Sequence, residues 1–131
     1  MKFQCNYNSE LNIIESATHG LGSRNEIIDM LRCILDLCIK NDTADIMVDH
    51  SDLDPSLMSM DDISKISRSV VEAKDILNKR KCAHIASKDI QFGLVRAWEI
   101  MIEIAGVPDF KTKVFREKKD ALEWIKSTPN L

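Results

Sequence analysis

Residues 82–126 decide the fold, and they read CAHIASKDIQFGLVRAWEIMIEIAGVPDFKTKVFREKKDALEWIK. The apolar run 82–86 has the length of a buried strand, and a strongly apolar segment of helical length, 89–104, follows a short polar break. A second strand-like run covers 112–116, and a helix is expected over 117–126. Strands and helices that alternate with short joints predict a parallel α/β sheet.

The first two-thirds of the chain extend the same pattern. Residues 2–8 alternate in polarity, and with 11–18 they predict an antiparallel hairpin joined by a short polar turn. Helical spacing of apolar residues predicts helices over 24–40 and from 59 to about 77, and the apolar run 44–48 predicts a central strand between them. The predicted order is β-β-α-β-α-β-α-β-α, a mixed, mostly parallel sheet of about five strands with four main helices.

This order also predicts where the helices lie. Right-handed crossovers between successive strands place most helices on one face of the sheet. The other face then needs a cover, either from the helix 24–40 or from a second copy of the chain. Because the helix 90–104 is apolar on nearly all sides, either it lies deep in the domain or one of its flanks meets a partner. We therefore expect a homodimer.

Length and composition narrow the class of protein. A chain of 131 residues is expected to form one domain, residues 1–131. The formal net charge of -3 gives no field that would attract nucleic acid. No apolar run is long enough to span a membrane or to act as a signal peptide, and the four cysteines form no CxxC pair. We expect a cytoplasmic protein with reduced thiols and with neither a metal nor a cofactor.

Polar side chains follow two of the predicted central strands. The loop after the strand 44–48 is expected to carry Asp49, His50, Ser51, Asp52 and Asp54. The loop after the strand 82–86 carries Ser87, Lys88 and Asp89, of which Ser87 or Asp89 could instead cap the next helix. The C-terminal ends of adjacent parallel strands meet at one edge of a sheet, where ligands commonly bind. These eight residues are the predicted ligand or partner edge, and the acids favour a polar or weakly cationic partner.

Three motifs resemble those of the STAS-like domain, the fold of sulphate-transporter and anti-sigma-factor-antagonist domains. They are IMVDHSD at 46–52, IASKDIQFGLVRAWE at 85–99 and VFREKKDALEWI at 114–125. The resemblance covers nearly the whole chain and is strongest to small stand-alone bacterial members. It implies a non-enzymatic module that binds a protein or a small ligand.

Signalling members of that family are switched by phosphorylation of a serine at the start of a helix. The resemblance makes Ser56 or Ser59 the possible phospho-acceptor, although this chain reads Asp54-Pro55-Ser56-Leu57 where the family has Asp-Ser-Ser/Thr-Gly. Ser59 is also a plain N-cap candidate, with Asp62 three residues later. Two alternatives stay open beside the binding module: a regulator switched by phosphorylation, and a small hydrolase that uses Asp49 and His50. No catalytic residue is predicted otherwise.

Overall fold

Five strands form one sheet in the computed structural model, which describes residues 1–127, and their spatial order follows the chain. Antiparallel pairing joins the first two strands, and all later pairs are parallel. This confirms the predicted fold class. The strands are β1 (Lys2–Asn8), β2 (Ile13–Leu21), β3 (Asp45–Asp54), β4 (Lys81–Ile85) and β5 (Lys111–Phe115). The predicted domain extends to residue 131, and its last four residues lie outside the described range.

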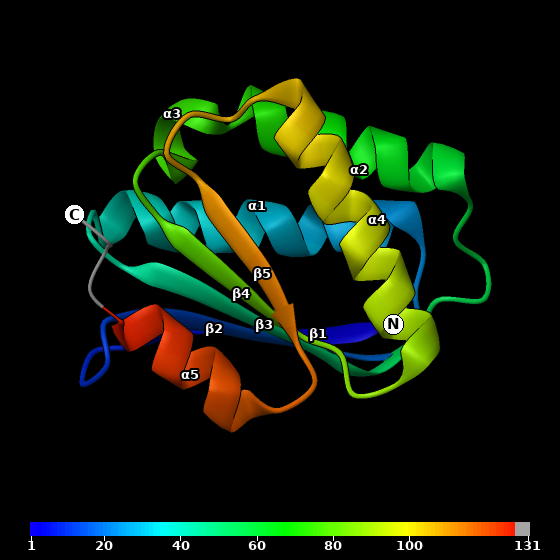
Figure 1. The fold of residues 1–131 in the computed structure, drawn as a ribbon, viewed down its shortest axis with the longest axis horizontal. Coiled ribbons are helices and arrows are strands. Elements are labelled where there is room, and N and C mark those ends of the chain that lie inside the picture. The colour runs from blue at the N-terminus through cyan, green and yellow to red at the C-terminus, as the bar shows by residue number, and fades with distance from the viewer. Residues whose placement is uncertain (128–131) are drawn as a thin grey trace.

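Three long helices cover one face of the sheet, and a fourth lies on the other face (Figure 1). The predicted helix 59–77 is interrupted at Ala73, which divides it into a long and a very short helix. The helices are α1 (Arg24–Lys40), α2 (Met60–Glu72), α3 (Lys74–Leu77), α4 (Asp89–Ala105) and α5 (Lys118–Lys126).

The alternation of side chains along the central strand explains the two layers. Ile46 and Val48 of β3 point to the face that α1, α2 and α4 cover, and they belong to the main core. Met47 lies between them in sequence and points to the opposite face, where α5 packs. A strand that is apolar on both faces must be buried on both, and this is the observed position of β3.

The prediction that α1 covers the remaining sheet face is wrong. Helix α1 packs beside α2 on the main face, and α5 covers the other face with Ala121 and Ile125. The part of that face formed by β1 and β2 needs no cover, because its side chains are largely polar: Lys2, Gln4, Asn6, Glu15 and His19.

Strands β2 and β3 run further than the sequence pattern predicts. The predicted loop residues His19–Leu21 and Asp52–Asp54 pair with each other in parallel register. A register shift between Ala17 and His19, with Gly20 in the left-handed region at φ 86°, lets β2 resume its pairing after an irregularity. The extension brings Leu53 into the core, where it is buried. Its apolar burial is the physical reason why this polar stretch is a strand.

Candidate functional site

A cavity of about 100 Å³ lies between the main face of the sheet and helices α1, α2 and α4. Its walls are mostly apolar side chains from these elements, among them Ile34, Val48, Ile66, Val70 and Val95. Side chains with polar atoms also reach the cavity: His50, His84, Gln91 and Trp98. The exposed surface of this space is nearly all apolar, so it could hold only a small apolar group.

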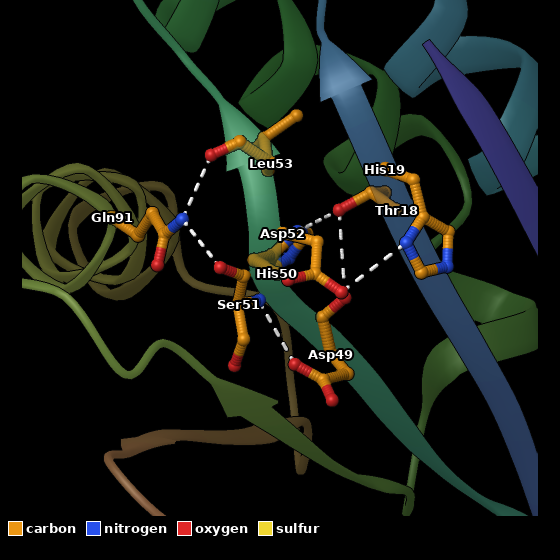
Figure 2. A network of polar contacts seen from close by, with 8 residues as sticks. All are labelled: Thr18, His19, Asp49, His50, Ser51, Asp52, Leu53 and Gln91. Atoms are coloured by element: carbon orange, nitrogen blue, oxygen red, sulfur yellow. Dashed lines mark hydrogen bonds and ion pairs between the residues drawn. The ribbon is translucent and has the colours of Figure 1, made fainter.

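Four buried side chains form a polar row across β2, β3 and β4, and we call them the buried polar row: Thr18, His50, His84 and Cys82. The His50 Nε2 and His84 Nδ1 atoms lie 3.3 Å apart, and the two rings are nearly parallel. Thr18 Oγ1 lies 3.3 Å from His50 Nδ1 at one end (Figure 2). Cys82 Sγ lies 3.4 Å from His84 Nε2 at the other end.

One choice of tautomers satisfies the whole row. The Cys82 thiol donates to His84, and His84 donates to His50. His50 then donates to the Thr18 hydroxyl, and that hydroxyl donates to the Asp49 carbonyl oxygen 3.4 Å away. Each ring thus carries a single proton and remains neutral, so the row ends on a backbone carbonyl and requires no charge.

Burial fixes the charge state of the cavity wall. Desolvation lowers the pKa of His50 to about 4, and burial together with His50 lowers the pKa of His84 well below its usual value. Burial also raises the pKa of the Cys82 thiol. At neutral pH the two imidazoles are therefore uncharged and the sulfur is a thiol, which is a poor nucleophile. The wall suits a neutral ligand.

Trp98 brings an unused hydrogen-bond donor to this region. Its ring meets the His84 ring edge to face at 4.7 Å between centroids. The indole Nε1 is buried and has no hydrogen-bond partner among residues 1–127. Buried donors are rarely left unpaired, so this N–H is a polar group of the residues around the cavity that lacks a partner in the described chain.

Glu99 is a second buried group next to the row. Thr112 Oγ1 donates to one carboxylate oxygen at 3.2 Å, while the other oxygen, Oε1, is buried without a partner in the described part of the chain. Burial raises the pKa of Glu99, although Arg96 and the Thr112 hydrogen bond oppose the shift. This carboxyl does not line the cavity.

Gln91 fixes the end of β3, and sequence reasoning missed it. Its Nε2 donates to the carbonyl oxygens of Ser51 at 2.9 Å and Leu53 at 2.8 Å, as Figure 2 shows. The side chain takes the place of β4, which ends at Ile85, before β3 does. Its Oε1 accepts from the Lys88 N–H, as a glutamine in the first turn of a helix often does. A glutamine three residues after the N-cap Lys88 was the sequence signal that could have indicated this role.

The structure separates the predicted residues of the β3 segment. Asp49 and His50 are adjacent in a strand and point to opposite faces, so only His50 reaches the cavity. The Asp49 carboxylate accepts from the Ser51 N–H, and Asp52 lies 3.3 Å from the His19 Nδ1 (Figure 2). Asp54 is exposed and accepts from the Ser56 N–H. The prediction that these residues form a loop is wrong, because Asp49–Asp54 lie within β3.

Strands β3 and β4 are adjacent and parallel, as predicted, so their C-terminal ends share an edge. The predicted caps are wrong: the N-cap position of α4 is Lys88, not Ser87 or Asp89. Arg116 holds this turn, because its Nη1 atom lies 2.7 Å from the Asp89 carboxylate and 3.4 Å from the Ser87 carbonyl oxygen. All three residues of the turn are exposed.

Ser59 is an N-cap, as one of the two sequence interpretations expects. Its hydroxyl accepts from the Asp62 N–H at 3.1 Å, and the Asp62 carboxylate accepts from the Ser59 N–H at 2.9 Å. Ser56 lies in the preceding turn and is exposed.

A second, polar hollow of about 200 Å³ lies beside α5 on the opposite face of the sheet. Its walls include Glu15, Asp49 and Lys118. Of the predicted ligand or partner edge, Asp49 is the residue that reaches this hollow. The hollow and the cavity are separated by the sheet, so they are two distinct places on the molecule.

The chain matches no protein-family model, no curated protein and no solved structure, and these comparisons identify no STAS-like family. Within residues 1–127, no cluster of three or more His, Cys, Asp or Glu side chains has the arrangement of a metal site. None of the helices in this range combines the length and the apolar character that crossing a bilayer requires.

Proposed function

We propose that this chain is a non-enzymatic, STAS-like binding module of a bacterial cytoplasm, and that it holds a small, neutral, largely apolar ligand in the cavity. The observation that carries the proposal is the buried Trp98 Nε1–H, which has no partner in residues 1–127 and belongs to a side chain of the cavity wall. A ligand with one hydrogen-bond acceptor would satisfy this donor.

The size and polarity of the cavity define the ligand class. A dry protein cavity of about 150 Å³ accepts benzene, so a space of about 100 Å³ suits a compound of a single small ring or a short branched chain. The uncharged imidazoles of His50 and His84 give an ionised ligand no counter-charge.

The hydrolase and a phosphorylation switch at Ser59 find less support. A hydrolase that uses Asp49 and His50 needs both groups at one reacting centre, whereas the two side chains point to opposite faces of β3. A switch at Ser59 needs a free hydroxyl, whereas this hydroxyl caps α2. A phosphate there would also meet Asp61 and Asp62 in the first turn of the helix.

Phenol is a suitable probe, because its ring is small and its oxygen can accept from an indole N–H. The chain has two tryptophans, so Trp124→Phe leaves a single indole N–H signal in a ¹H–¹⁵N spectrum. Phenol should shift the Trp98 signal saturably, whereas benzoate, which is charged at neutral pH, should leave it in place at the same concentration.

A matched pair of variants shows where phenol binds. Val95 lines the cavity, so Val95→Phe should fill it and abolish the saturable shift. Val71 lies on α2, is half-buried and does not line the cavity, so Val71→Phe should leave the shift intact. No saturable response to phenol in the parent protein, or an equal response in Val95→Phe, would contradict the proposal.

A further inference from the structure

Helix α4 has an apolar face that nothing in the described chain covers. Ile100 is 44% exposed and Ile104 is 82% exposed, which is unusual for isoleucine. Together with Ile90, Gly93 and Ala97 they are spaced three and four residues apart, the spacing of a helix that packs along a second helix. We call these five residues the α4 seam.

Gly93 makes a notch in this seam. A glycine in a helix costs about 1 kcal/mol relative to alanine, so it needs a reason. A Cβ atom placed on Gly93 would meet nothing within 4 Å, and its φ is not positive. Packing within the chain therefore gives no reason for the glycine, and the open space above it can take a large side chain from another molecule.

The seam is complementary to itself when two copies run antiparallel. In the heptad notation for packed helices, Ala97 and Ile104 occupy position a, and Gly93 and Ile100 occupy position d. In an antiparallel pair the a positions of one helix face the d positions of the other. Gly93 then faces Ile104 of the second copy, and Ala97 faces Ile100 of the second copy. Each large side chain meets a small one, and the two-fold axis repeats every contact.

Charges flanking the seam favour the same register. Arg96 and Glu103 lie on one flank, with Arg96 Nη1 3.8 Å from Glu103 Oε1 within the chain. In the antiparallel register Arg96 of each copy faces Glu103 of the other copy, so the two-fold axis gives two Arg–Glu ion pairs. A parallel pair would instead place glycine opposite glycine and Arg96 opposite Met101, leaving a hole and no ion pair.

We propose that the α4 seam is a homodimer interface, in which two copies of this chain pack α4 against α4 in antiparallel orientation. This inference is independent of the ligand proposed for the cavity, because the seam points away from the sheet. It specifies the surface that the expected homodimer uses, one flank of α4, and the alignment of the two helices.

Light scattering of the full chain tests the dimer. The expected mass is twice the 14.9 kDa of the chain. Gly93→Leu should give a monomer, because the leucine fills the notch that receives Ile104, and it should leave the helix content seen by circular dichroism intact, because leucine favours a helix over glycine. Ile104→Glu should also give a monomer. Ile39→Glu is the matched control, since Ile39 is 62% exposed on α1, and it should remain a dimer.

Charge reversal tests the register. Arg96→Glu should weaken the dimer about tenfold or more, because symmetry introduces two like-charge contacts. Arg96→Glu combined with Glu103→Arg should restore it, whereas a parallel dimer would show no such rescue.

Either of two results would overturn the inference. One is a monomer mass at concentrations up to about 100 μM, which would exclude all but very weak association. The other is a dimer that persists in both Gly93→Leu and Ile104→Glu while circular dichroism shows both variants folded, since the copies would then meet elsewhere.

Discussion

Arg80 shows at the scale of one residue how a buried charge is stabilised without a carboxylate contact from residues 1–127. Its side chain is buried, and the guanidinium donates to the carbonyl oxygens of Ile76 at 2.8 Å, Cys38 at 3.0 Å and Asn41 at 3.1 Å. Two of these carbonyls belong to the C-terminal end of α1, where helices leave acceptors unpaired and carry partial negative charge. Arg80 therefore joins α1, α3 and β4 at one point.

Arg80→Met should lower the free energy of unfolding by about 3 kcal/mol or more, because it keeps the stem and leaves several buried carbonyls unpaired. Urea unfolding measures the loss. Arg68→Met, at an exposed position of α2, serves as the control and should change the free energy by less than about 0.5 kcal/mol. Equal effects of the two substitutions would show that the carbonyl contacts contribute nothing.

His50 and His84 should make the fold sensitive to mild acid. Because their folded-state pKa values are lowered, between pH 6.5 and about 4 the unfolded chain binds protons that the folded chain does not. The contribution of the two histidines to the free energy of unfolding is therefore greatest above pH 6.5 and falls as the pH falls through this window. For His50 alone the drop from 6.5 to about 4 corresponds to about 3 kcal/mol when complete.

The raised pKa of Glu99 acts in the opposite direction, since its stabilising contribution is present at low pH and is lost as the pH rises. The cleanest measurement uses the Glu99→Gln background and urea unfolding at about pH 7 and about pH 5. Adding His50→Gln should make the difference between these two values smaller. An unchanged difference would show that His50 does not titrate as its burial implies.

At the scale of elements, periodicity predicted the strands and helices because it records which face of each segment is buried. The hairpin of β1 and β2, the helix α1 and the apolar run of β4 all follow that local rule. The extension of β3 to Asp54 does not, because it depends on pairing with His19–Leu21 and on a side chain from α4. The residues around the cavity could not be predicted from the sequence for the same reason, because their contacts join segments far apart in the chain. His84 lies within the predicted strand 82–86, and no local pattern indicates its partner His50, which lies 34 residues away in the chain.

Gln91→Leu tests the contact between α4 and the end of β3. The variant keeps the side-chain volume and leaves the Ser51 and Leu53 carbonyls without their donor, so it should cost about 2–4 kcal/mol. Hydrogen exchange should show faster opening at Asp52–Asp54 than at the centre of β3. Gln4→Leu on the polar side of β1 is the control and should affect neither quantity.

At the scale of the whole molecule, the sheet separates two cores of unequal size. The main core includes side chains from α1, α2 and α4, while the smaller one on the other face is built mainly from Ile13, Met47, Ala83, Ile85, Ala121 and Ile125. Lys81 fastens the end of α5, because its ammonium donates to the carbonyl oxygens of Trp124 at 3.0 Å and Ser127 at 2.6 Å. Helix α5 thus packs on the smaller of the two cores.

Native-state hydrogen exchange should therefore report a lower opening free energy for the amides of α5 than for those of α1. Lys81→Met should lower the value for α5 further, by about 1–2 kcal/mol, and leave α1 unchanged. Simultaneous opening of both helices with one free energy would mean that the two cores unfold as a single unit.

The sheet order β1-β2-β3-β4-β5 has a consequence for how the chain reaches this structure. Each strand after β1 pairs with the strand that precedes it in the sequence, so its pairing partner has already been synthesised when it emerges. Such a chain needs no long loop to close before an early strand is paired, which keeps the contact order low for a mostly parallel sheet. The nascent chain can add strand to strand as it leaves the ribosome, with α5 closing the second face last.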